Sequence, residues 1–295
     1  MTENLRGAVL MMASMATFTF NDACIKLLAE GMPTWQAVFL RGVGVSILIA
    51  LLAHRTGALA RPIPRADRGR VFARATAEVF AIIPFILALT HMPLANVTAI
   101  LQALPLTITA AGAILLRERV GWRRWTAIMV GFAGVLLIVR PGTEGFNGWS
   151  LLAVLAVIII TARDLITRRL SPEVPSLKVA LFTAVGVTGL GFILSLRTPW
   201  EMPSAGQGGV VLLASVFILG GYLFSIMAMR VGEVAVVTPF RYTAMIWGLV
   251  LGFLVFGDWP TVPTFAGAAL IAGTGLYTFW RETRSGPVRV PPHPG

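Results

Sequence analysis

Charged side chains stand inside two apolar segments of this chain at positions that repeat. Asp22 precedes Lys26 by four residues, and Asp164 precedes Arg168 by the same spacing 142 positions later. Residues four apart lie on one face of an α-helix, so each acid can meet its base. The pairs could act as gates or coupling sites. They could equally be local ion pairs whose long cations reach toward water.

Three more charges occupy neighbouring apolar segments. Arg74 and Glu78 are also four residues apart. Glu78 could carry a coupling proton or contact a solute, or it could serve only as the partner of Arg74. Arg41 has no acidic neighbour on its own helix, so we expect it to pair across helices, for instance with Asp22.

The segment around Pro239 combines a backbone break with a cation and two aromatic rings. Pro239 removes a backbone donor and frees carbonyl groups. A membrane tolerates such a break only against protein or a wet cavity. Arg241 is a cation beside the break, and Tyr242 and Trp247 offer flat faces to a planar ligand. The alternative for the two rings is ordinary packing within a helix bundle.

These polar and aromatic positions define a predicted solute site. The stretch 140 residues before Pro239 adds polar groups and another proline: Asn96, Thr98, Gln102 and Pro105. From these segments we predict that the substrate-binding residues are Asp22, Glu78, Gln102, Asp164, Arg241, Tyr242 and Trp247. Arg241 could also pair with Glu78 or Asp164, and pairing does not exclude ligand binding.

The sequence contains no recognisable catalytic or metal-binding motif. It lacks a nucleophile elbow, a Walker A loop and a HExxH zinc motif. Cys24 is the only cysteine, and the three histidines are scattered. We therefore predict no enzyme activity, no catalytic residues, no metal and no cofactor.

The composition indicates what kind of protein must position these residues. Of 295 residues, 56% are hydrophobic and only 13% are charged, whereas a soluble domain carries about 25% charge. The formal net charge of +11 could indicate nucleic-acid binding. Because the basic residues lie between apolar spans, membrane orientation explains them better. We predict an integral membrane protein in a lipid bilayer that binds no nucleic acid.

Spanning the hydrocarbon takes about 20 apolar residues per helix. Ten segments qualify: 5–26, 34–53, 71–90, 94–115, 122–139, 149–168, 178–196, 209–229, 234–256 and 264–280. With the N-terminus in the cytoplasm, the inner connections hold seventeen Lys and Arg residues and the outer ones three. This is the asymmetry of the positive-inside rule, so we predict ten spans with both termini cytoplasmic in the inner (cytoplasmic) membrane.

The chain also repeats itself. Residues 88–98 align without a gap to residues 228–238, and the same offset of 140 pairs Gly112 with Gly252. Each half holds five spans, and an odd number inverts the second half relative to the first. Inverted repeats are typical of secondary transporters, which alternate access to a site between the halves.

Several motifs resemble the EamA type of the drug/metabolite transporter superfamily. In the first half they are AILQALPL at 99–106, LRERVGW at 116–122 and GFAGVLLIVRPG at 131–142. In the second half they are VVTPFRY at 236–242, VFGD at 255–258 and GAALIAGTGLY at 267–277. Asp258 stands where the family usually has Glu, whereas the first half keeps Glu118. These acids lie at span ends and are expected to be structural.

The resemblance implies an all-α integral membrane protein of ten transmembrane helices in two inverted five-helix repeats. We predict repeats at 5–142 and 149–281 and a disordered cytoplasmic tail at 282–295. We predict a secondary carrier, monomeric or homodimeric, for a small organic metabolite such as a planar or anionic solute like riboflavin. The alternatives are an exporter of amino acids or related metabolites, an S-adenosylmethionine-type uptake carrier, and a membrane scaffold or receptor that transports nothing.

Overall fold

The computed structural model describes residues 3–115, 121–140, 147–231 and 237–285. Within these ranges the regular structure is entirely helical. The first half comprises α1 (Glu3–Gly31), α2 (Thr34–Arg55), α3 (Arg65–His91), α4 (Leu94–Leu101), α5 (Leu104–Leu115) and α6 (Trp122–Val139). The second half comprises α7 (Trp149–Arg168), α8 (Ser176–Ser195), α9 (Ala205–Val231), η1 (Thr238–Tyr242), α11 (Thr243–Phe256) and α12 (Val262–Ser285).

Ten spans account for these elements. Eight are long and apolar enough to cross a membrane, with α4 and α5 counted as one span. Two shorter apolar helices, Trp125–Val139 and Val262–Tyr277, supply the fifth and tenth. The prediction of a ten-helix membrane protein is confirmed.

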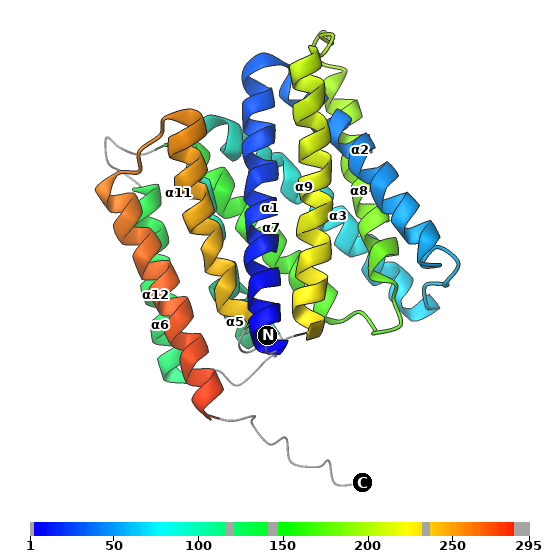
Figure 1. Ribbon diagram of the computed structural model, residues 1–295. Helices are drawn as coiled ribbons and strands as arrows, with labels where there is room; N and C mark the ends of the chain where they lie inside the picture. Colours follow the sequence, from blue (N-terminus) through cyan, green and yellow to red (C-terminus); the bar gives the residue numbers. More distant parts are fainter. Residues whose placement is uncertain (1–2, 116–120, 141–146, 232–236, 286–295) are drawn as a thin grey trace.

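The two halves pack as inverted copies. In Figure 1, α3 begins at the end of the bundle that holds the N-terminus, whereas α9 begins at the opposite end. The ranges of α3 and α9 are nonetheless equivalent, since each boundary is displaced by the same 140 residues. Equivalent helices therefore run in opposite directions, because each half contains an odd number of spans.

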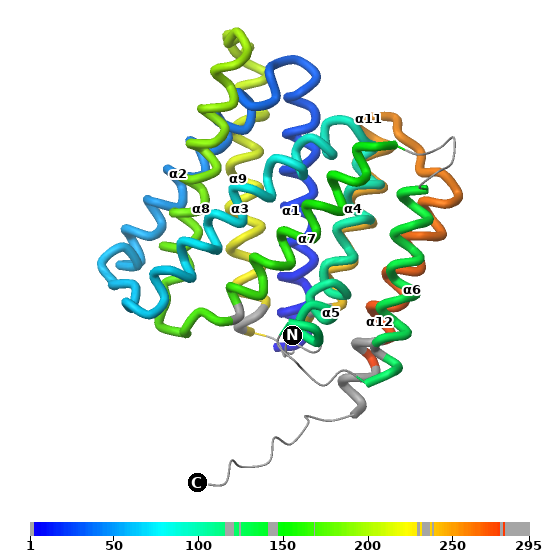
Figure 2. Tube along the Cα trace, turned by 180° about the vertical axis from the view of Figure 1, so that it is seen from behind, coloured from blue at the N-terminus to red at the C-terminus, as the bar shows by residue number. Residues whose placement is uncertain are grey.

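Helix pairing obeys the same two-fold relation. The most extensive contacts join α1 to α9 and, equivalently, α7 to α3. The other two major contacts, α2 with α8 and α6 with α12, pair a helix with its own counterpart. Figure 2 shows α2 and α8 at one edge of the bundle and α6 and α12 at the other. The halves are therefore interleaved rather than packed side by side as separate domains.

Glycine lets the α6–α12 pair approach closely. A Cβ on Gly134 would lie 2.7 Å from the Gly267 carbonyl oxygen and 3.0 Å from Ile271. A Cβ on Gly267 would overlap the Gly134 carbonyl oxygen in return. The two backbones touch at this point, as small residues allow between membrane helices.

The fourth and ninth spans both contain an irregular turn. The fourth breaks at Gln102, between α4 and α5, with Pro105 in the next turn. The ninth begins as the 3₁₀ turn η1 around Pro239 and continues as α11 from Thr243. The predicted break at Pro239 is present, and the 140-residue offset places it opposite the break of the fourth span.

Candidate functional site

A cavity of about 410 Å³ lies inside the bundle. Residues of α1, α2, α3, α4, α5, α7, α8, α9, η1 and α11 line it, so both halves contribute. The interruptions of the fourth and ninth spans border it through Gln102 and Arg241. Both breaks therefore lie beside a cavity, where a membrane tolerates irregular backbone.

The cavity brings together five of the seven predicted binding residues. Asp22, Glu78, Gln102, Asp164 and Arg241 line it, and they come from α1, α3, the α4–α5 break, α7 and η1. This placement makes them available to a solute.

The other two predicted residues lie outside the lining. Tyr242 is buried against α12, where a Cβ on Gly275 would overlap its ring and hydroxyl. Trp247 packs against Phe20, with ring centroids 5.8 Å apart. The alternative interpretation of both rings as packing elements describes their positions better.

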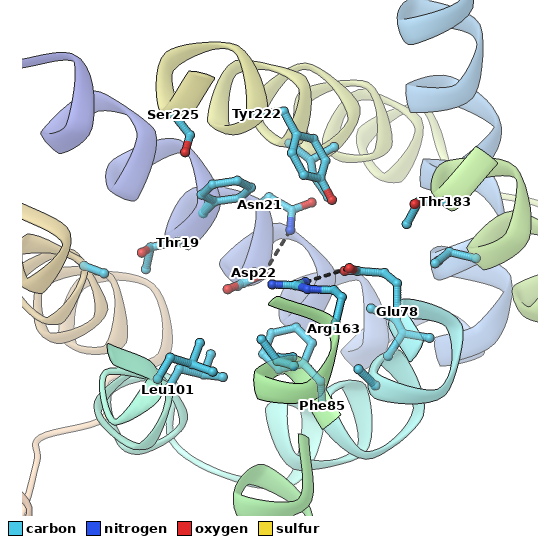
Figure 3. A pocket seen from close by; sticks show the side chains of 18 of the residues that line it. Thr19, Asn21, Asp22, Glu78, Phe85, Leu101, Arg163, Thr183, Tyr222 and Ser225 are labelled. Carbon is cyan, nitrogen blue, oxygen red and sulfur yellow. Dashed lines mark hydrogen bonds and ion pairs between the residues drawn. The ribbon is translucent and has the colours of Figure 1, made fainter. Parts of the chain in front are cut away.

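Aromatic faces reach the cavity from other helices instead. Phe18, Phe85 and Tyr222 line it, and Figure 3 shows Phe85 and Tyr222 on opposite sides of the central charges. Tyr222 was not among the predicted binding residues. The signal that could have found it is the polar pair Tyr222 and Ser225, three residues apart in the mostly apolar α9.

A cluster of three charges occupies the centre of the site. Arg163 donates through Nη1 to Glu78 Oε2 at 2.6 Å. Its Nε and Nη2 donate to Asp164 Oδ1 at 2.8 and 2.7 Å. Figure 3 shows the contact between the Arg163 guanidinium and Glu78, both of which line the cavity. A cation held by two carboxylates joins α7 to α3, the helix pair that mirrors α1 and α9.

The expected pairing within helices is absent from these residues. Arg74 does not bind Glu78; its Nε and Nη1 donate to Thr167 and Thr183 at 3.1 and 2.8 Å. Lys26 does not bind Asp22; its ammonium donates to the backbone carbonyls of Leu89 and Met92. The i, i+4 spacing permitted both local pairs, but in a bundle the better acceptors lie on neighbouring helices. The side chain of Arg168 lies outside the described part of the chain.

Arg41 does reach across helices, as predicted, but to a neighbour of the expected partner. Its Nη1 donates to Asn21 Oδ1 at 3.2 Å, and Asn21 Nδ2 donates to Asp22 Oδ1 at 3.0 Å. Arg41 is 4% exposed, and its Nε has no hydrogen-bond partner among the described residues. The Asn21 amide thus connects Arg41 to Asp22 through two hydrogen bonds.

Arg241 differs from the other lining cations. Within the described ranges, no hydrogen bond or ion pair joins its guanidinium to another residue. The expected alternative of an ion pair with Glu78 or Asp164 is therefore not present. Among the described residues, four arginines and three carboxylates line the cavity. With every group ionised, four minus three leaves one positive charge.

Comparison with known proteins agrees with this architecture. The family model described as the EamA-like transporter family matches residues 5–140 and 147–279. The chain belongs to the EamA-like transporter family. The resemblance stated from the motifs is thereby confirmed, with two copies of the family domain, although the boundaries 5–142 and 149–281 themselves stay predictions.

Curated relatives of the full chain are named as transporters. An S-adenosylmethionine uptake transporter of Rickettsia prowazekii is 24% identical over 290 residues, 95% of each chain. A riboflavin transporter of Vibrio cholerae is 26% identical over 95% of each chain. A pseudopaline exporter of Pseudomonas aeruginosa is 24% identical over 90% of this chain and 94% of its own. This chain is accordingly a multi-pass membrane transporter of small molecules and not an enzyme.

A solved crystal structure shares the fold. It superposes with a TM-score of 0.65 at 18% identity and covers 95% of this chain and 98% of its own.

Proposed function

We propose that this protein is a secondary carrier that moves a small organic metabolite across the cytoplasmic membrane by alternating access. The observation that carries the proposal is the charged cavity at the seam of two inverted repeats, bordered by both broken helices. Inverted repeats with discontinuous helices at a midplane site are the architecture of secondary transporters.

The proposed orientation has both termini in the cytoplasm. Exposed arginines gather at the end of the bundle where α1 begins, in the α2–α3 connection and the start of α3: Arg55, Arg61, Arg65, Arg68 and Arg70. Positive charge favours the cytoplasmic side of a membrane. We also propose a monomer or a homodimer.

A planar or anionic solute fits the site best. The described lining has one positive charge in excess, and the Arg241 guanidinium makes no hydrogen bond or ion pair with a described residue. A guanidinium binds carboxylate or phosphate through parallel hydrogen bonds. Phe18, Phe85 and Tyr222 supply faces for a ring. Riboflavin, the solute named for the Vibrio cholerae relative, is planar and heads the test panel.

An amphoteric solute is the second candidate. Asp22 lines the same cavity and accepts a hydrogen bond from the Asn21 amide, without an ion pair among the described residues. A carboxylate there and Arg241 could bind the two charges of an amino acid or of S-adenosylmethionine, the solute named for the Rickettsia prowazekii relative.

Flux into proteoliposomes tests the proposal. Purified protein is reconstituted and offered radiolabelled riboflavin, S-adenosylmethionine and amino acids, with and without a proton gradient, beside protein-free liposomes. We expect saturable uptake of at least one solute and competition by its analogues. Uptake equal to that of empty liposomes across the panel would instead favour a scaffold or receptor.

A further inference from the structure

Buried apolar side chains close the end of the cavity opposite the N-terminus. Among the described residues, the lining ends at Asp22 on α1 and at Phe85 on α3, nine and six residues before these helices end. Beyond these positions, toward the same end, lie buried apolar side chains: Ile25, Leu28, Leu89, Met92 and Leu94. An apolar layer therefore closes this end.

One cation fastens that layer. Lys26 Nζ donates to the carbonyl of Met92 at 2.7 Å and to that of Leu89 at 3.3 Å. Both carbonyls belong to the turn that ends α3 before α4 begins. The same ammonium lies 5.2 Å from the centroid of the Phe256 ring, at the end of α11. Lys26 thus joins α1 to the α3–α4 turn and to α11, three elements that must separate for this end to open.

We infer that Lys26 is the latch that holds this end of the cavity closed. A gate needs contacts that can break and form again, and the two hydrogen bonds of Lys26 meet this need. Leu89 and Met92 offer carbonyls left without helical partners at the end of α3, so water can replace the ammonium when α1 moves away. The inference rests on the proposed carrier function, because only a carrier needs this end to open.

A second lysine in the protein makes a useful contrast. Lys178 Nζ also donates to two backbone carbonyls, those of Leu59 and Arg61, at 3.0 and 2.8 Å. It ties the start of α8 to the α2–α3 connection, away from the cavity lining. The two lysines have the same chemistry, but only Lys26 crosses the closed end.

Cysteine labelling tests the latch. The background is Cys24→Ser with Leu101→Cys, a lining position beneath the closed end. A membrane-impermeant charged thiol reagent is added to reconstituted protein from the side on which Gly209→Cys, near the start of α9, is labelled. We expect Lys26→Met to raise the labelling rate at position 101 about tenfold, the order of effect of losing a charge-assisted hydrogen bond. Lys178→Met should leave the rate unchanged.

Two further variants keep the result decisive. Lys26→Arg retains a cation and should label slowly. Phe256→Leu removes only the ring beneath the ammonium and should raise the rate about threefold, which gives a second reading if Lys26→Met does not accumulate. Equal rates in the Lys26 and Lys178 variants, or no rise with Lys26→Met and Phe256→Leu, would overturn the latch. Because labelling needs no transported solute, a responsive latch with no flux would count against the proposed function alone.

Discussion

At the scale of single residues, the site is organised by arginines that differ in how they are neutralised. Arg163 is held between Glu78 and Asp164, whereas Arg41 meets a carboxylate only through Asn21. Arg241 has neither kind of partner among the described residues. Arg163 is therefore expected to maintain structure, and Arg241 to be free for a solute.

Removing the central cation should destabilise the protein. Arg163→Gln leaves Glu78 and Asp164 without their partner, and their side chains are 16% and 23% exposed. We expect the free energy of unfolding to fall by about 1–3 kcal/mol, less than for a fully buried pair because water reaches the site. Thermal unfolding in detergent measures this. Adding Glu78→Gln should restore part of the loss, and simple additivity of the two effects would contradict a coupled cluster.

Truncating the unpaired cation should affect transport and not assembly. Arg241→Ala should reduce flux of the transported solute at least about tenfold, since a charged hydrogen bond to the solute is lost. Membrane insertion and thermal stability should be unchanged. Arg241→Lys should keep partial activity, and Arg197→Ala, at an exposed loop position, provides the control. Normal flux in Arg241→Ala would show that the solute lies elsewhere.

At the scale of elements, the bundle is fastened by symmetric contacts at the helix ends. Gln36, at the start of α2, exchanges two hydrogen bonds with the backbone of Glu201 in the α8–α9 connection. Lys178, at the start of α8, binds the carbonyl of Arg61 in the α2–α3 connection. Glu201 and Arg61 are 140 residues apart, so the two contacts are equivalent under the repeat. Different side chains perform the same task at opposite ends.

The fourth and ninth spans pack closely where α11 meets α4. Two glycines four residues apart in α11, Gly248 and Gly252, differ in how close this contact is. A Cβ on Gly248 would lie 2.9 Å from Thr98 Cβ, whereas one on Gly252 would meet nothing closer than 3.8 Å. Gly248→Ala should therefore force α4 and α11 apart and lower thermal stability. Gly252→Ala in the same helix should be neutral or stabilising, because alanine is the better helix former. Equal effects would mean that α4 and α11 do not touch at Thr98.

At the scale of the whole molecule, inversion accounts for both the fold and the cavity. Interleaved pairing of α1 with α9 and α3 with α7 puts residues of both halves around one space. Neither half could enclose this cavity alone. Opening to one side or the other then becomes a rearrangement between related halves.

Inversion has a direct test in labelling from two sides. Gly69 and Gly209 are exposed, equivalent under the 140-residue offset and free of neighbours within 4 Å of an added Cβ. In a Cys24→Ser background, Gly69→Cys should react only from the side of the N-terminus and Gly209→Cys only from the other side. If both cysteines reacted from the same side, the two halves would not be inverted and the carrier proposal would be wrong.

The sequence alone determined the membrane class, the ten spans and the duplication. Hydrophobic runs, arginine placement and an ungapped repeat are properties of the linear chain. It also indicated which spans carry charged or polar side chains, because such a group in an apolar run is visible without coordinates. Asp22, Glu78, Gln102, Asp164 and Arg241 could be chosen in this way.

Only the tertiary structure decided the partners. Spacing along one helix suggested Lys26 with Asp22 and Arg74 with Glu78, but both cations donate to acceptors on other elements instead. Likewise Tyr242 and Trp247 looked suited to a ligand, but both rings pack against other helices. Tyr222 lines the cavity instead. The physical reason is that a helix fixes which residues share a face, whereas the orientation of that face depends on every helix packed against it.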